Sequence, residues 1–190
     1  MFLIRTIVGA AFIASLSACT GPSPVPVARA MVYYDRAAFV ATLKHDMPVV
    51  TGDVVQHGRC EVFVTTPENN VGSQKPCVFA LTRETVYIAS WNAFGTKYEN
   101  LMTIPLNGVD QVAYTAFGGM RQVQLTEKKR LLGLAVFNDE ATANPEKETK
   151  QAFESIKDSG VPEGKSIRGV IFSNALYYST YSPIYINTRK

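Results

Sequence analysis

The chain has 190 residues, of which 46% are hydrophobic and 18% are charged, so it is long and apolar enough to bury a core. Lysine and arginine total 19 and aspartate and glutamate 16, for a formal net charge of +3 at neutral pH. This small excess argues against a nucleic-acid-binding protein, which presents a strongly basic face.

The N-terminus has the order of a secretory signal peptide. Arg5 supplies a positive charge, residues 7–16 form an apolar stretch, and Ser17 and Ala18 are small. The apolar stretch is shorter than the roughly 20 residues that a membrane-spanning helix needs. Residues 1–18 are therefore predicted to be a signal peptide.

The end of this segment, Leu16-Ser17-Ala18-Cys19, resembles the lipobox of bacterial lipoproteins. The resemblance implies cleavage before Cys19 and attachment of acyl chains to it, which bind the protein to a membrane. Thr20 stands where an aspartate marks inner-membrane retention in enterobacterial lipoproteins, so the resemblance implies the outer membrane, with the protein facing the periplasm. The alternative is an ordinary signal peptide in which Cys19 has no role.

A proline-rich stretch follows the cysteine. Pro22, Pro24 and Pro26 alternate with other residues, and proline restricts both its own backbone and that of the preceding residue. Residues 19–30 are predicted to be a lipidated, semi-rigid tether. Residues 31–190 are then one domain by length.

The domain is expected to begin with a short helix at 35–45. Asp35 suits an N-cap, Phe39, Val40 and Leu43 recur at helical spacing, and Pro48 follows the end.

From about residue 54 to 137, short β-branched and apolar runs alternate with turn signals. The runs are 60–66, 77–81, 85–91, 98–106, 111–117, 121–126 and 131–137. Between two of them, Gly118-Gly119 predicts a two-residue hairpin, because both glycines can take positive φ. Short strands at this spacing predict an antiparallel meander that forms a small barrel or sandwich.

A second helix is expected at 145–159, with Asn144 as N-cap and Pro145 at the first position. Its apolar stripe consists of Thr149, Ala152, Phe153 and Ile156. A stripe this narrow predicts a helix that caps one open end of the β structure. Strands are expected again at 166–187. This tail contains Tyr177, Tyr178, Tyr181 and Tyr185, which suit either a half-buried sheet edge or a contact surface.

Residues 77–158 resemble bacterial pleckstrin-homology-like and GRAM-like domains. The segments that carry the likeness are "CVFALTRETVYIAS", "TIPLNGVDQVAY", "RQVQLTEKKRLLGLAVF" and "PEKETKQAFESI". The resemblance implies a mainly β domain with helices (α+β), capped by one helix on its C-terminal side, that acts as a binding or interaction module. The N-terminal helix lies outside it.

Cys60 and Cys77 remain once Cys19 is assigned to the lipid. An exported protein meets an oxidising compartment, so the two are predicted to form a disulfide. Two alternatives use His57: a zinc site with both cysteines, and a nucleophile pair with Cys60.

Two groups of residues are candidate binding sites. Trp91, Phe94 and Tyr98 cluster around a loop, where they either form an exposed binding surface or fill the mouth of the β structure. Lys128, Lys129 and Arg130 lie on an expected hairpin turn and are either solvated charges or a contact for an anionic group.

No hydrolase elbow, phosphate loop or dinucleotide-binding motif is present, so neither catalytic residues nor a cofactor or metal is assigned. The favoured hypothesis is a non-catalytic, membrane-anchored lipoprotein that binds or scaffolds a protein partner in the cell envelope. One alternative is an envelope hydrolase or metal-dependent enzyme built from His45, His57 and the carboxylates Asp35, Asp46 and Asp53. Another is a lipid or glycan carrier, which needs a hollow interior.

Overall fold

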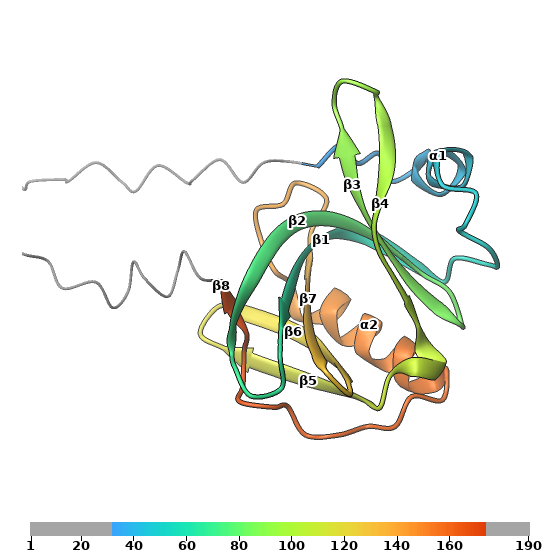
Figure 1. Ribbon diagram of the computed structural model, residues 1–190. Coiled ribbons are helices and arrows are strands. Elements are labelled where there is room, and N and C mark those ends of the chain that lie inside the picture. Colours follow the sequence, from blue (N-terminus) through green and yellow to red (C-terminus); the bar gives the residue numbers. More distant parts are fainter. Residues whose placement is uncertain (1–31, 174–190) are drawn as a thin grey trace, which may run out of the picture.

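The computed structural model describes residues 32–173 (Figure 1). The expected signal peptide, Cys19, the proline-rich tether and the four tail tyrosines lie outside the described residues. Of the strands expected at 166–187, the described part contains one short strand, β8 (Phe172–Ser173). Within residues 32–173, neither helix has the length and apolar character to cross a bilayer.

The fold is α+β and pleckstrin-homology-like, with an antiparallel sheet and one helix after it, as predicted. In chain order the strands are β1 (Gln56–Thr65), β2 (Val71–Leu81), β3 (Thr85–Asn92), β4 (Lys97–Pro105), β5 (Gln111–Phe117), β6 (Met120–Glu127) and β7 (Arg130–Phe137), with a short 3-10 helix, η1 (Leu106–Gly108), between β4 and β5. Their order in the sheet is β4-β3-β2-β1-β7-β6-β5, and β8 pairs in parallel with β2.

The sheet curls but is not closed into a barrel (Figure 1). Its edge strands β4 and β5 do not pair with each other in the described part of the chain. The edge of β5 is covered instead by the segment that follows the second helix. There Val112 N donates to Pro162 O, and Gly164 N donates to Val112 O, both at 2.9 Å. The expected barrel is therefore an open, strongly bent sheet.

Strand β7 shows why the run "LLGLAVF" is apolar throughout. Alternate residues of a strand point to opposite faces, and both faces are covered here. Leu132, Leu134 and Val136 join the core against the second helix. Leu131, Ala135 and Phe137 join a smaller cluster on the other face, together with Ile171.

Helix α2 (Glu146–Asp158) packs on the sheet through the four residues of the predicted stripe, all buried. Asn144 is not its N-cap. The residue before the helix is Pro145, and no side chain caps the first turn. The Asn144 side chain accepts a hydrogen bond from Arg121 N and donates to Val136 O, so contacts with two strands outweigh local capping.

Helix α1 (Phe39–Asp46) begins four residues later than predicted. Asp35 Oδ1 accepts hydrogen bonds from the backbone N–H groups of Ala37 (3.0 Å) and Ala38 (3.4 Å). These bonds hold a turn before the helix, because a short acidic side chain competes with helical backbone pairing. The helix then buries Phe39 and Leu43, two of the three predicted apolar positions, and leaves the third, Val40, partly buried.

The β5–β6 hairpin turns through Gly118-Gly119, between the paired residues Phe117 and Met120. Gly118 has a φ of +56°, but Gly119 does not share this positive value. The predicted two-residue hairpin is confirmed, and only the first glycine uses the left-handed region that was open to both. A two-residue hairpin of the other favoured type requires positive φ at the first position only.

Cys60 on β1 and Cys77 on β2 stand directly opposite each other and are joined by a disulfide, with Cα atoms 4.8 Å apart. Both are buried in the core beneath α2. His57 is three positions before Cys60, so it points to the opposite face of the sheet. That geometry and the disulfide oppose both alternatives that combined His57 with a free cysteine.

The fully buried Gln122 on β6 fixes the chain after α2 to the outer face of the sheet. Its amide donates to Ile171 O and accepts from Ile171 N, each at 2.8 Å. Gly133 on the neighbouring strand provides the space, because a Cβ there would lie 2.8 Å from Gln122 Oε1. The side chain of Gln122 thus satisfies the backbone N–H and C=O groups of Ile171, which are not paired with a strand.

We predict that Phe153→Ala lowers the free energy of unfolding by about 3 kcal/mol or more, because a buried aromatic ring leaves a cavity when it is removed. Urea unfolding measures the change. The control Lys147→Ala, exposed on the same helix, should stay within about 0.5 kcal/mol of the native protein. A change of no more than about 0.5 kcal/mol in Phe153→Ala would show that α2 does not pack on the sheet through this ring.

We also predict that non-reducing peptide mass analysis finds Cys60 joined to Cys77. The double change of both residues to serine should cost about 3 kcal/mol, since the bridge closes a loop across a sequence separation of 17. Two free thiols in the exported protein would contradict the assignment.

Candidate functional site

The β3–β4 hairpin carries all three of the aromatic residues singled out in the sequence. Trp91 and Tyr98 are paired across the two strands, and their rings meet edge to face with centroids 5.0 Å apart. Phe94 lies in the turn between the strands. In Figure 1 this hairpin projects beyond the rest of the sheet. The structure therefore brings the three residues onto one element, but into different environments.

Their exposure differs sharply. Tyr98 is only 1% exposed, Trp91 is partly buried, and Phe94 is fully exposed with a relative value of 103%. The two alternatives, an exposed binding surface and a buried cluster, thus each apply to different residues of this group. Tyr98 is a core residue, and Phe94 is the exposed one.

The turn is held by its own polar groups. Asn92 Oδ1 accepts hydrogen bonds from Phe94 N at 3.0 Å and Gly95 N at 2.9 Å, and Asn92 Nδ2 donates to Glu99 Oε1 at 2.7 Å. Thr96 adopts a φ of +47°. The Phe94 side chain is therefore presented by an ordered loop.

Tyr33 completes this surface, and no local pattern in the sequence pointed to it. Its ring lies 4.6 Å from that of Trp91, and its carbonyl accepts a hydrogen bond from the Tyr98 hydroxyl at 2.9 Å. Tyr33 is 47% exposed. We call Tyr33, Trp91, Phe94 and Tyr98 the aromatic hairpin end. The described chain therefore begins against this hairpin.

His57 lies on β1 beneath α1 and is half-buried. Its ring stacks on Phe39 at 5.2 Å, and its Nδ1 is 3.0 Å from the hydroxyl of Tyr34. Burial lowers the pKa of His57, and the nearby Arg36 lowers it further. Burial also raises the pKa of Tyr34 to about 12. At neutral pH the imidazole is therefore uncharged, and its tautomer decides which of the two groups donates in this hydrogen bond.

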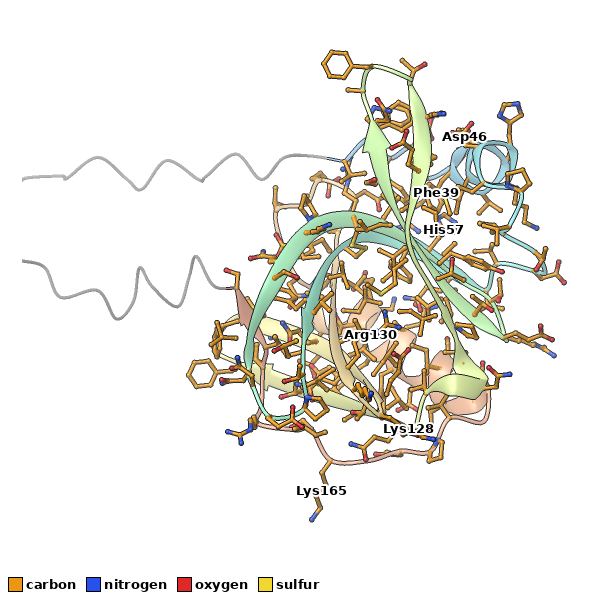
Figure 2. The ribbon with its side chains drawn as sticks, in the orientation of Figure 1. Phe39, Asp46, His57, Lys128, Arg130 and Lys165 are labelled. Atoms are coloured by element: carbon orange, nitrogen blue, oxygen red, sulfur yellow. A yellow bond between two sulfur atoms is a disulfide. The ribbon has the colours of Figure 1, made fainter. Side chains whose placement is uncertain are left out.

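His45 has a different setting. It is on α1, 87% exposed, with its Nδ1 3.0 Å from Asp46 Oδ1. Burial acts to raise the pKa of Asp46, but hydrogen bonds from His45 and from Tyr98 N hold it below its ordinary value. His45 and His57 thus have separate partners. Figure 2 shows His57 and Asp46 as two separate positions.

The carboxylates expected to join them do not form a shared site. Asp35 accepts hydrogen bonds from the turn before α1, and Asp53 lines a groove on the loop before β1. In residues 32–173 no three side chains of histidine, cysteine, aspartate or glutamate are arranged to hold a metal ion. The enzyme alternative therefore has no assembled constellation in the described part of the chain.

Figure 2 shows Lys128 of the basic turn far from Asp46 on α1, with Arg130 between these two positions in the view. Lys128 and Lys129 are exposed. Arg130 forms a two-pronged ion pair with Glu127, with N–O distances of 2.6 and 2.7 Å. Two of the three cations therefore face solvent, and the third is neutralised by its strand neighbour. The structure does not bring them to the aromatic hairpin end.

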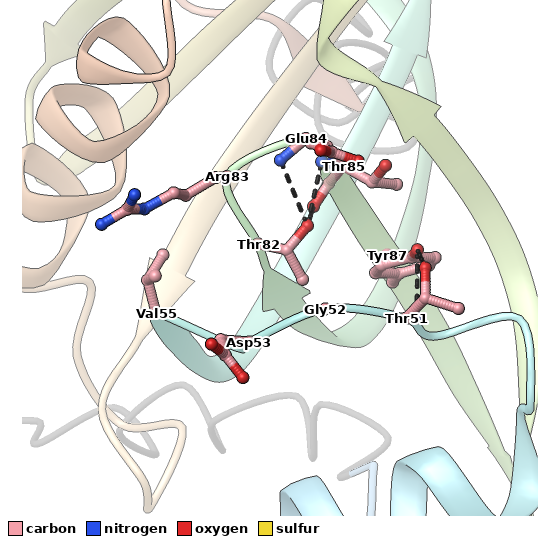
Figure 3. A pocket seen from close by; sticks show the side chains of 9 residues that line it. All are labelled: Thr51, Gly52, Asp53, Val55, Thr82, Arg83, Glu84, Thr85 and Tyr87. Atoms are coloured by element: carbon pink, nitrogen blue, oxygen red, sulfur yellow. Dashed lines mark hydrogen bonds between the residues drawn. The ribbon is translucent and has the colours of Figure 1, made fainter.

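A groove of about 530 Å³ lies between the loop before β1 and the β2–β3 turn (Figure 3). Thr82 Oγ1 accepts from Glu84 N and Thr85 N, and Tyr87 OH is 3.4 Å from Thr51. These polar groups hold the turn together. A second hollow beside His57 measures about 160 Å³, room for a few water molecules.

No known protein family matches the sequence, and no curated protein matches it either. Among solved structures, autoinhibited Vav1 is similar at 17% identity and a TM-score of 0.40, over 62% of this chain but only 18% of the Vav1 chain. The hSac2 domain from the human phosphoinositide phosphatase Sac2 is similar at 11% identity and a TM-score of 0.39, over 70% of this chain and 92% of that one. The fold described above rests on the strand order and on α2, not on these similarities.

We predict that the free energy of unfolding falls as the pH is lowered from about 7 to 5. The folded-state pKa of His57 is below its ordinary value, so the unfolded chain binds the proton first and acid favours unfolding. Urea unfolding at several pH values measures the slope, and His57→Gln should flatten it. His45→Gln is the matched control, because these are the two histidines of the chain.

Carboxylates with lowered pKa values, such as Asp46 and Asp139, change the free energy of unfolding in a separate pH range, below about pH 4.5. A native profile that is flat between pH 7 and 5, or a slope removed by His45→Gln, contradicts the role given to His57.

Proposed function

We propose that this protein is a lipid-anchored, non-catalytic binding module of a bacterial cell envelope. The observation that carries the proposal is the sequence Leu16-Ser17-Ala18-Cys19 at the end of a signal-like apolar stretch. It places a cysteine where a lipoprotein is cut and acylated. The proline-rich residues 20–30 then separate that cysteine from the folded domain.

The chemistry of the anchor explains why a single cysteine is enough. Each buried CH₂ contributes about 0.8 kcal/mol, so one acyl chain holds a protein only marginally, whereas two or three hold it firmly. A lipoprotein cysteine carries acyl chains on both its sulfur and its amino group. The domain therefore needs no membrane-spanning helix of its own.

The other two cysteines support the same compartment. A disulfide such as Cys60–Cys77 persists in the periplasm or at a cell surface, where thiols are oxidised. With Thr20 after Cys19, we place the protein at the outer membrane, facing the periplasm.

A binding role is favoured over catalysis by the arrangement of the polar side chains. His57 is engaged by Tyr34, and His45 by Asp46, so neither is poised against a nucleophile. The exposed side chains of the aromatic hairpin end are of the kinds that make contacts, since aromatic residues are enriched at interfaces. The recognised partner is a component of the envelope.

We predict that Cys19→Ser moves the protein from the membrane to the soluble fraction of fractionated bacterial cells, because no acyl chain is attached. The control is the double change of Cys60 and Cys77 to serine, which removes two cysteines but keeps the acylation site, and it should stay with the membrane. Unchanged membrane retention of Cys19→Ser refutes the anchor.

A further inference from the structure

The aromatic hairpin end lies where the tether meets the domain. Tyr33, at the start of the described chain, packs on Trp91 and accepts a hydrogen bond from Tyr98. In Figure 1 the described chain starts beside the β3–β4 hairpin. Phe94, in the turn of this hairpin, follows Trp91 by only three residues. The start of the domain and the hairpin tip are therefore neighbours.

The tether is comparable in length with the diameter of the domain. Val32 is thirteen residues after Cys19. At no more than about 3.6 Å per residue, this chain spans at most roughly 47 Å, which is close to the diameter of a domain of this size. A membrane that holds Cys19 therefore has the β3–β4 hairpin within reach.

We propose that the tip of the β3–β4 hairpin, with Phe94 foremost, inserts into the same lipid bilayer that holds Cys19. This inference rests on the proposed anchoring at Cys19. The hairpin becomes a second membrane contact, which fixes the orientation of the domain on the bilayer.

The side chains have the chemistry of a membrane interface. Phe94 is fully exposed, and its ring gains by leaving water. Trp91 and Tyr33 lie behind it, and tryptophan and tyrosine favour the headgroup region of bilayers. Lys97 begins β4 directly after the turn, and its exposed cation is attracted to anionic lipid.

The acidic side chains near this contact have partners of their own. Glu99 accepts the hydrogen bond from Asn92, and Asp46 accepts those from His45 and from Tyr98 N. The turn is held by Asn92, so little order has to be created when Phe94 enters the lipid. A hairpin already folded loses less entropy on contact than a flexible loop.

The test uses Trp91 as a reporter, because it is the one tryptophan in the chain. The mature chain, residues 19–190 with its disulfide formed, is coupled through the Cys19 thiol to a maleimide headgroup lipid. The vesicles contain phosphatidylethanolamine and phosphatidylglycerol brominated on the part of the acyl chain next to the headgroup, which quenches a tryptophan at the boundary between headgroups and hydrocarbon. Matched vesicles without bromine give the reference emission.

We expect the brominated vesicles to quench Trp91. Phe94→Ser should lower the equilibrium constant for insertion about ten-fold or more, with a corresponding loss of quenching. Phe117→Ser is the matched control. Phe117 is also an exposed phenylalanine, at 68%, in the turn region of a different hairpin, and its replacement should leave the quenching unchanged.

Unquenched Trp91 on vesicle-bound protein overturns the proposal and leaves the tip for a protein partner. Equal quenching in Phe94→Ser and the native chain overturns it too. The chemical coupling supplies the anchor whether or not a cell acylates Cys19. Failure of the proposed function would therefore show in the cell fractionation, and failure of this inference in the fluorescence.

Discussion

The pairing of β1 with a strand on each side is the constraint on which the rest of the structure depends. Residues 56–64 pair with β2, and residues 59–65 pair with β7, so one strand joins the two halves of the sheet. Because side chains alternate between faces, the same strand sends Cys60 to the core under α2 and His57 to the face under α1. The disulfide, the half-buried histidine and the contacts with both helices follow from this placement.

Local patterns predicted the elements of the fold but not the way in which they are covered. The stripe of α2 and the apolar run of β7 are visible in the sequence because each is defined by near neighbours. The open sheet was not visible, because the edge of β5 is covered by residues near Pro162, about 50 positions away. The start of α1 was misplaced for a related reason, since Asp35 can cap a helix or hold a turn with the same side chain.

The candidate site was predictable in its location and not in its detail. The sequence placed Trp91, Phe94 and Tyr98 around one loop, and they share one hairpin. Their different burial arises because Trp91 and Tyr98 are cross-strand partners while Phe94 lies in the turn. Tyr33 was missed because only tertiary packing brings it to the hairpin.

The protein has a disulfide-linked, pleckstrin-homology-like domain, and we propose that one acylated cysteine attaches it to the membrane. The most direct measurement is the intact mass of the protein extracted with detergent from its native bacterial membrane, followed by mass analysis of its N-terminal peptide. The account predicts a chain that starts at Cys19 and carries acyl chains there. An N-terminal peptide with an unmodified Cys19, or one that still includes residues 1–18, would contradict it.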